Sequence, residues 1–146
     1  MYRLMIDTNI LLDSLIQGRP DEDGARELFD WCTWSGDMGM VTPSSLNDTY
    51  YLLRKRMAEP YARKAIQSLM ELLVIAPLSW EECSVSITSD EPDFEDGLVR
   101  AAAELNDADF IITRDERAFK NSKLKCMTAS EYLAWAKAQD KRHSDF

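Results

Sequence analysis

Short apolar runs alternate along the chain with longer segments in which apolar residues recur every three or four positions. The short runs, bounded by polar or turn-forming residues, predict buried strands at 3–7, 38–42, 74–76, 110–113 and 124–127. The longer segments predict helices over about 9–16, 22–34, 44–57, 60–73, 94–105 and 130–138, with a short one opening at 79–82. Strands that alternate with helices form a parallel sheet covered on both faces. The predicted fold class is therefore α/β, a three-layer domain around a mostly parallel sheet of about four to five strands.

The length of 146 residues fits a single domain with one core. We expect this domain to cover residues 1–138 and a flexible C-terminal tail to cover 139–146. No apolar run approaches the roughly 20 residues needed to span a bilayer, and the first run reaches Asp7 too soon for a secretory signal. Three widely separated cysteines fit a reduced protein better than a disulfide scaffold. We therefore expect a cytoplasmic protein that makes no membrane contact.

The formal net charge of −9 changes the range of functions that the fold allows. Proteins that coat nucleic acid are normally basic, so this charge argues against that class. It leaves open an enzyme that meets nucleic acid through bound divalent ions. The excess of acidic residues also raises the question of whether carboxylates are grouped in the fold.

Four aspartates occupy positions from which their carboxylates can converge. Ligands of parallel sheets bind beyond the carboxyl ends of the strands; Asp7 closes the first strand, and Asp115 follows the strand at 110–113. Asp48 and Asp96 lie early in helices whose N-termini point to the same edge. Such carboxylates repel one another without a cation, and oxygen ligands suit Mg²⁺ or Mn²⁺. One or two such ions beside a phosphodiester can activate water and offset charge on the leaving oxygen.

The sequence offers few of the residues and motifs that other kinds of catalysis require. The single histidine, His143, lies in the predicted tail, which disfavours acid–base catalysis by histidines. Neither a GxGxxG fingerprint nor a P-loop is present, which disfavours nucleotide-driven and hydride-transfer chemistry. The residues therefore favour metal-dependent phosphodiester chemistry at the acidic cluster.

Four sequence blocks resemble those of PIN domains, in the order that this family has them. They are Ile6-Asp7-Thr8-Asn9 with Leu11-Leu12-Asp13, residues 44–55, Asp93-Phe94-Glu95-Asp96-Gly97-Leu98, and Ile112-Thr113-Arg114-Asp115 with Phe119. The match runs from residue 4 to about 135 and is similar to the VapC-type branch of bacterial toxins. The resemblance implies a Rossmann-like fold and a Mg²⁺- or Mn²⁺-dependent endoribonuclease that cleaves RNA. It also implies a toxin that a cognate antitoxin protein holds inactive, often as a homodimer.

The resemblance implies roles for individual residues as well. Asp7, Asp96 and Asp115 would be the metal ligands, and Asp48 would complete the catalytic quartet. Many PIN toxins have glutamate in the second block, so the shorter Asp48 is expected to reach the metal either directly or through water. Hydrogen bonds that support the site would come from Asn9 and Thr113. Substrate binding would fall to the nearest basic residues, Arg114, Arg117 and Lys120.

Each of these roles has a structural alternative. Asp7 and Asp115 are of a type that caps helices, and Asp48 and Asp96 lie opposite the apolar stripes of their helices, as solvated residues do. Glu95 competes with Asp96 as the functional acid. A phosphatase with Asp7 as its nucleophile is weakened because the residue two positions on is not a second aspartate. A non-catalytic module whose acidic edge docks a basic partner peptide is the remaining alternative.

Overall fold

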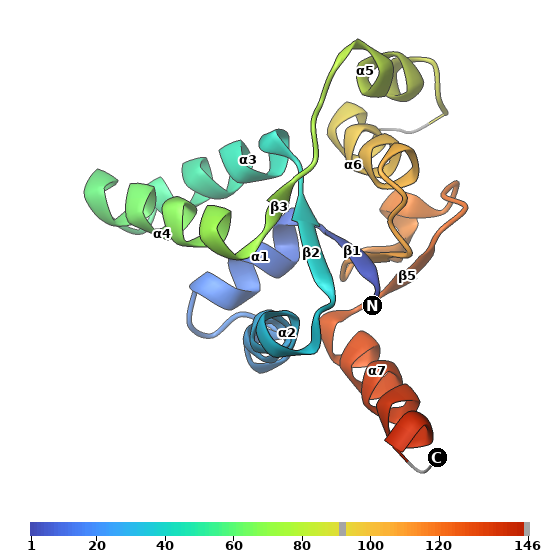
Figure 1. Cartoon of the computed structure of the whole chain (residues 1–146). Coiled ribbons are helices and arrows are strands. Elements are labelled where there is room, and N and C mark those ends of the chain that lie inside the picture. Colours follow the sequence, from blue (N-terminus) through green and yellow to red (C-terminus); the bar gives the residue numbers. More distant parts are fainter. Residues whose placement is uncertain (91–92, 145–146) are drawn as a thin grey trace.

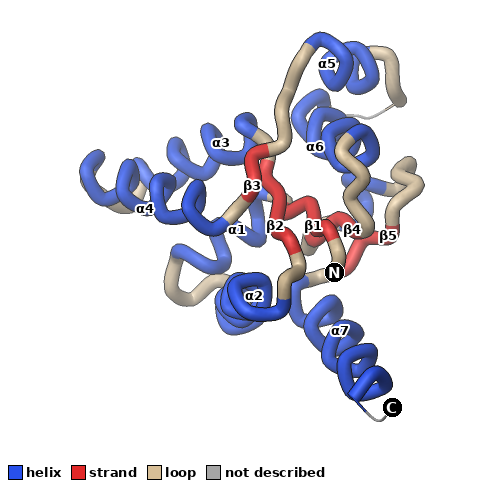
Figure 2. Tube along the Cα trace, in the orientation of Figure 1, coloured by secondary structure: helices blue, strands red, loops and turns tan. Residues whose placement is uncertain are grey.

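The computed structural model, which describes residues 1–90 and 93–144, contains a sheet of five strands in the order β3-β2-β1-β4-β5 (Figures 1 and 2). The strands are β1 (Arg3–Ile6), β2 (Met38–Val41), β3 (Val74–Ile75), β4 (Phe110–Ile112) and β5 (Lys125–Met127). Each strand pairs in parallel with its neighbours. The predicted α/β class and the predicted parallel sheet are therefore confirmed.

Helices connect the strands and follow the last one. They are α1 (Thr8–Leu15), α2 (Glu22–Ser35), α3 (Pro43–Arg54), α4 (Glu59–Leu72), α5 (Trp80–Ile87), α6 (Phe94–Leu105), the 3-10 helix η1 (Glu116–Phe119) and α7 (Ala129–Ser144). α7 passes the predicted end at Ala138, so residues 139–144 are helical, whereas 145–146 lie outside the described residues. The division into a domain and a flexible tail stays a prediction. Among the described residues, no helix has the length and apolar content that crossing a bilayer requires.

Successive residues of the central strand β1 face opposite layers of helices, as the pleat of a strand requires. Leu4 and Ile6 belong to a core that includes residues of α1, α2, α4 and α7. Met5, between them, belongs to a second core with residues of α6. All three side chains are fully buried. The unbroken apolar sequence of β1 therefore follows from its place at the centre of a sheet that is covered on both faces.

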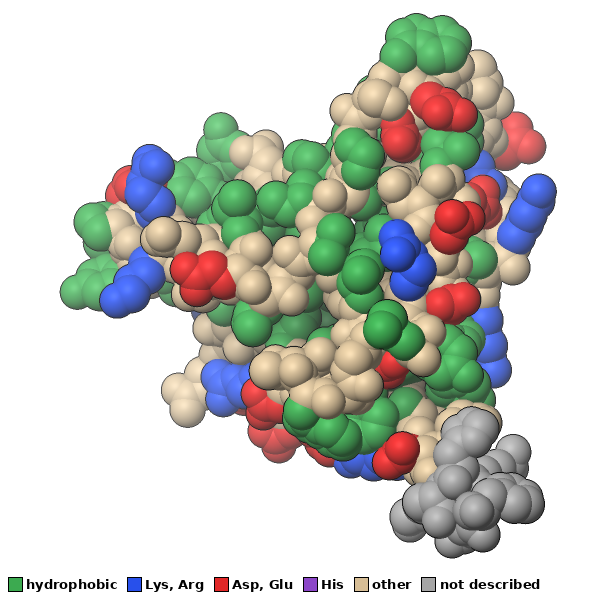
Figure 3. Space-filling view, in the orientation of Figure 1, with side chains coloured by type: hydrophobic (Ala, Val, Ile, Leu, Met, Phe, Trp, Pro, Cys, Tyr) green, Lys and Arg blue, Asp and Glu red, His purple; other side chains and the backbone are tan. Residues whose placement is uncertain are grey.

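The α3–α4 hairpin extends past the sheet beside its β3 edge (Figure 1). Hydrophobic side chains are exposed over this hairpin and over α5 (Figure 3), including Tyr51, Met70, Leu72 and Trp80. A hollow of about 830 Å³ opens beside them, with Leu46 and other residues of α3 and α4 in its wall. Exposed apolar side chains beside a hollow of this size are typical of protein interfaces.

The chain reverses its direction across the sheet between β1 and β4. From β1 it proceeds to β2 and β3 on one side, and it then returns to place β4 and β5 on the other. In open α/β sheets, ligands bind outside the carboxyl ends of the strands at such a switch point. Asp7 and Thr113 are the first residues after β1 and β4. The fold therefore places these two side chains where a ligand site is expected.

A buried aspartate joins several elements at the amino ends of the strands, away from the carboxyl ends where Asp7 and Thr113 lie. Asp37 precedes β2, is 8% exposed, and accepts hydrogen bonds from the Tyr2 backbone N–H (2.9 Å), Trp31 Nε1 (2.8 Å) and the Tyr132 hydroxyl. Burial, together with the hydrogen bond to Asp37, raises the pKa of Tyr132, so its hydroxyl keeps the proton that it donates. The carboxylate of Asp37 thereby joins α2, α7 and the start of β1.

Replacing Asp37→Asn is expected to lower the free energy of unfolding by roughly 2–3 kcal/mol, because hydrogen bonds to a buried charged group are among the strongest that folding makes. Urea unfolding followed by tryptophan fluorescence measures the change. Asp30→Asn, at an exposed position of α2, is the matched control and should change stability by less than about 0.5 kcal/mol. An Asp37→Asn protein as stable as the control would contradict the prediction.

Candidate active site

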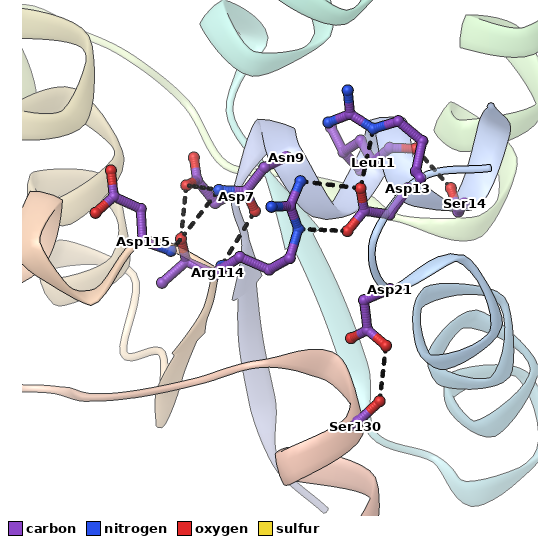
Figure 4. Close-up of polar contacts among 11 residues, drawn as sticks. Asp7, Asn9, Leu11, Asp13, Ser14, Asp21, Arg114, Asp115 and Ser130 are labelled. Carbon is purple, nitrogen blue, oxygen red and sulfur yellow. Dashed lines mark hydrogen bonds and ion pairs between the residues drawn. The ribbon is translucent and has the colours of Figure 1, made fainter. Parts of the chain in front are cut away.

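Asp7 is the best-defined side chain of the site because it both ends β1 and caps α1. Its Oδ1 accepts a hydrogen bond from the Thr8 backbone N–H at 2.8 Å. Its Oδ2 accepts one from the Thr113 hydroxyl at 2.8 Å and one from Asn9 Nδ2 at 3.2 Å (Figure 4). Asp7 is 7% exposed. A carboxylate this buried keeps one position only because these donors surround it.

Thr113 and Asn9 extend these hydrogen bonds to the backbone of the segment that follows β4. The Thr113 hydroxyl oxygen accepts hydrogen bonds from the Asp115 backbone N–H (3.0 Å) and Asn9 Nδ2 (3.3 Å). Asn9 Oδ1 accepts one from the Arg114 backbone N–H at 3.3 Å. Asp115 itself is exposed and caps η1, its side chain accepting from the Ala118 backbone N–H. The backbone that carries Asp115 is thus hydrogen-bonded to residues around Asp7.

Six acidic side chains line one hollow of about 270 Å³ beside Asp7. It brings together all four predicted aspartates, from the ends of β1 and β4 and from α3 and α6, with two further acids of the α6 start. The wall is completed by three residues of α1, and the full lining is Asp7, Thr8, Asn9, Leu12, Asp48, Asp93, Glu95, Asp96 and Asp115. Asp93 also caps α6, because its side chain accepts hydrogen bonds from the backbone N–H groups of Glu95 and Asp96. Capping and a place in the hollow are therefore compatible.

The crowding of these groups alters their protonation. Burial raises the pKa of Asp7, hydrogen bonds from Thr113 and Thr8 oppose that rise, and the nearby charge of Asp115 adds to it. Burial, a hydrogen bond between the carboxyl groups of Glu95 and Asp48, and the surrounding negative charges raise the pKa of Glu95 to about 8. In the metal-free protein at neutral pH, Glu95 therefore holds a proton that it donates to Asp48.

The donor set fits a hard divalent cation in its chemistry. It consists of oxygen atoms alone, which suits Mg²⁺ or Mn²⁺ better than zinc. Thr8 Oγ1 is buried at the hollow and has no hydrogen-bond partner among the described residues. Across residues 1–90 and 93–144, no three Asp, Glu, Cys or His side chains already surround a common point as metal ligands do. Binding of a cation therefore requires side chains at the rim, such as Asp96 and Asp115, to rotate inward.

The structure gives the three basic residues predicted to bind substrate different surroundings. Arg114 directs its guanidinium away from the hollow onto Asp13, with Nε–Oδ2 at 2.7 Å and Nη2–Oδ1 at 3.1 Å (Figure 4). Arg117, in η1, and Lys120, which ends η1, are exposed close to Asp115 in the chain. Arg117 and Lys120 thus keep their side chains accessible, whereas Arg114 is engaged by the protein itself.

Sequence reasoning missed two features of this region. Asp13 was read only as part of a motif, yet it is fully buried in α1 and holds two arginines, Arg19 and Arg114. A signal was present, because Asp13 lies three positions after the buried Ile10, where an apolar residue is expected. The contact between Glu95 and Asp48 had no signal in sequence, since it joins two helices that are distant in the chain.

Comparison with known proteins adds a family and a fold. The family model described as PIN domain matches residues 3–117. No curated protein matches the chain. Similar solved structures include VapBC from Salmonella typhimurium bound to DNA, with 15% identity, a TM-score of 0.66, and coverage of 88% of this chain and 99% of that one.

Two further structures resemble the chain to a similar degree. VapBC2 from Rickettsia felis, bound to a DNA fragment from its promoter, has 16% identity and a TM-score of 0.65, covering 86% of this chain and 98% of that one. VapC20 from Mycobacterium tuberculosis, a sarcin–ricin loop cleaving toxin, has 16% identity and a TM-score of 0.65, covering 81% and 94%. At these identities the similarity establishes the shared three-layer fold.

The raised pKa of Glu95 predicts how the stability of the metal-free protein depends on pH. Because the folded-state pKa of about 8 lies above the ordinary value of 4.5, the folded protein binds a proton that the unfolded chain releases. The contribution of Glu95 to stability is therefore fully present below about pH 4.5 and is lost as pH rises through about 8, and the raised pKa of Asp7 acts in the same direction. Glu95→Gln should flatten this dependence and make the metal-free protein more stable than wild type above pH 8.

Urea unfolding in the presence of a chelator, at several values of pH, measures this effect. Glu71→Gln, at an exposed position of α4, is the control and should follow the wild-type curve. If Glu95→Gln and wild type lose stability equally between these pH values, the shared proton does not exist.

Proposed function

This chain belongs to the PIN-domain family, and on that premise we propose that it is a metal-dependent endoribonuclease, the toxin of a toxin–antitoxin pair. The observation that carries the proposal is the single hollow at the switch point of the sheet, lined by acidic side chains from four separate segments. So many carboxylates in one small space repel one another. A divalent cation makes that arrangement favourable, and a phosphodiester is a substrate that such a cation can activate.

In this proposal, Asp7, Asp96 and Asp115 hold Mg²⁺ or Mn²⁺. A carboxylate offers about four lone-pair directions, and Asp7 uses three of them for hydrogen bonds, which leaves one on Oδ1 for a cation. When bound, the ion supplies an activated water and offsets negative charge on the leaving oxygen. Asn9 and Thr113 support the site by keeping the Asp7 carboxylate in one orientation.

Asp48 and Glu95 are hydrogen-bonded to each other in the lining of the hollow. Their common proton lets two carboxyl groups lie in contact without full repulsion. A cation that attracts the Asp48 carboxylate, directly or through a water, would favour loss of that proton. Asp48 thus acts as the fourth acid of the proposed quartet, and Glu95 is its immediate partner.

The hydrogen bonds of Asp7 weigh against the phosphatase alternative. A nucleophilic carboxylate needs an oxygen with freedom to approach phosphorus, whereas Asp7 Oδ2 receives two donors and Oδ1 receives one. Asp7 is suited to hold a cation at a fixed place rather than to attack. The non-catalytic binding module remains the outcome that an absence of cleavage would favour.

Cleavage of RNA with Mn²⁺ tests the proposed activity. Asp7→Asn and Asp96→Asn should each lower the rate of cleavage by at least about 100-fold. Loss of a residue that only hydrogen-bonds to a metal ligand already costs up to about 100-fold, and loss of a ligand itself should cost no less. A chelator should abolish wild-type cleavage, and the exposed control Asp30→Asn should keep it. Failure of the wild type to cleave any RNA with Mn²⁺, or equal rates in wild type and both variants, would refute the nuclease.

We also propose an antitoxin partner that inserts a basic side chain into the acidic hollow. The net charge of −9 and the lining carboxylates favour a cationic group, and arginine makes paired hydrogen bonds to a carboxylate. Two of the similar structures are VapBC complexes bound to DNA, which supports a partner protein for this chain. The exposed apolar side chains of α3, α4 and α5 offer the remaining contact area for an antitoxin or a second copy.

An arginine-bearing peptide should therefore inhibit Mn²⁺-dependent cleavage in competition with the metal. Inhibition should weaken as the salt concentration rises from about 0.1 M to 1 M, because the Debye screening length falls from about 10 Å to 3 Å. The same peptide with glutamine in place of arginine is the control. Equal inhibition by both peptides would show that the acidic hollow does not recognise the basic group.

A further inference from the structure

Asp13 is a buried charged group that the proposed chemistry does not use. It is 0% exposed, although it carries a carboxylate near the end of α1. Oδ1 accepts from Arg19 Nε at 3.0 Å and from Arg114 Nη2 at 3.1 Å, and Oδ2 accepts from Arg114 Nε at 2.7 Å. A buried ion pair of this kind is weak evidence for stability alone, because desolvation offsets much of the attraction. Its geometry therefore needs another explanation.

Asp13 and Asn9 together hold Arg114 on one side of α1. They are four positions apart and so lie one above the other on the helix surface. Asn9 accepts from the backbone N–H of Arg114, and Asp13 accepts from its guanidinium. Arg114 lies between the Asp7 cluster and Asp13, as Figure 4 shows. A single residue is thus held at its backbone and at the far end of its side chain.

This arrangement attaches the segment after β4 to α1 at two separated points. Thr113 is hydrogen-bonded to Asp7 at the start of the helix, and Arg114 is paired with Asp13, six residues further on, or about 9 Å along the axis. The contacts with Asp7 and Asn9 alone would hold the segment only near the start of the helix, whereas the contact with Asp13 holds it at a second, separated place. Asp115 directly follows Arg114, so the backbone from which its side chain extends is held in place as well.

We propose that Asp13 is a positioning residue of the site: by holding the Arg114 guanidinium, it fixes the backbone from which the Asp115 side chain turns towards Asp7 to share a cation. This inference rests on the proposed function. It explains why an arginine next to the site points away from it and why α1 buries an aspartate among its apolar residues. Arg19 shares the carboxylate but lies in the loop after α1, outside the segment that carries Asp115.

Mn²⁺ binding to the full chain tests this role without RNA. Asp13→Asn keeps the shape of the side chain and removes its charge, and it should weaken Mn²⁺ binding by about 10- to 100-fold, as loss of a group that orients a metal ligand does. Arg114→Lys keeps a charge but loses the paired geometry, and it should weaken binding in the same direction by a smaller factor. Calorimetry or the electron paramagnetic resonance signal of free Mn²⁺ measures both.

Two controls separate positioning from general damage. Arg19→Gln removes a contact to the same carboxylate without touching the Asp115 segment, and Asp37→Asn removes another buried aspartate, at the amino ends of the strands. Both should bind Mn²⁺ within about twofold of wild type, even though Asp37→Asn unfolds more easily. The inference is overturned if Asp13→Asn binds Mn²⁺ as wild type does, or if the controls weaken binding as much as Asp13→Asn and Arg114→Lys.

Cleavage and structure supply readouts that a merely structural role would not move. The rate of Asp13→Asn should return towards the wild-type value as Mn²⁺ is raised, whereas a partly unfolded population would stay slow at every concentration. Metal-free crystal structures of wild type and Asp13→Asn should differ in the position of Asp115 relative to Asp7. That comparison needs neither metal nor RNA, so its outcome does not depend on whether the wild type cleaves RNA. If Asp115 has the same position in both structures, the inference is overturned.

Discussion

The site depends on keeping a buried carboxylate, Asp7, in one place at the carboxyl end of the central strand. Burial alone disfavours the charged form and raises its pKa. The backbone N–H of Thr8, the hydroxyl of Thr113 and the amide of Asn9 offset that cost, and two of these donors come from α1. Because Thr113 belongs to the neighbouring strand connection, the same hydrogen bonds that hold Asp7 also join the two sides of the switch point.

Strand order turns this local network into a site. β1 and β4 are neighbours in space and far apart in the chain, so residues 7 and 113 meet only because the sheet is parallel and reverses its order between them. The helix starts that follow bring Asp48 and Asp96 to the same hollow. Asp7 and Asp115 also have an ordinary local role as helix caps. The common place of the four aspartates arises from topology, which brings positions that are far apart in the chain to one hollow.

The elements of the fold and the grouping of the four aspartates in one hollow were predictable for a physical reason. Strands such as β1 are short, wholly apolar and bounded by polar residues, and the helices between them keep a clear apolar stripe. The carboxyl ends of parallel strands lie at the same end of a sheet, so the sequence alone is enough to group Asp7 with Asp115. The end of α7 was less predictable, because its last two turns are polar and nothing in the sequence stops a helix at Ala138.

Side-chain partners between distant segments could not be predicted in this way. Arg114 stands beside a predicted metal ligand, and from sequence its charge suggested contact with a phosphate. Which carboxylate an arginine chooses depends on burial and approach geometry: Asp13 is fully enclosed and offers both oxygens to Nε and Nη2, while the rim acids are more hydrated. A desolvated carboxylate left without a cation would be far more costly than an exposed one. The buried carboxylate of Asp13 therefore binds the guanidinium of Arg114, which points away from the hollow.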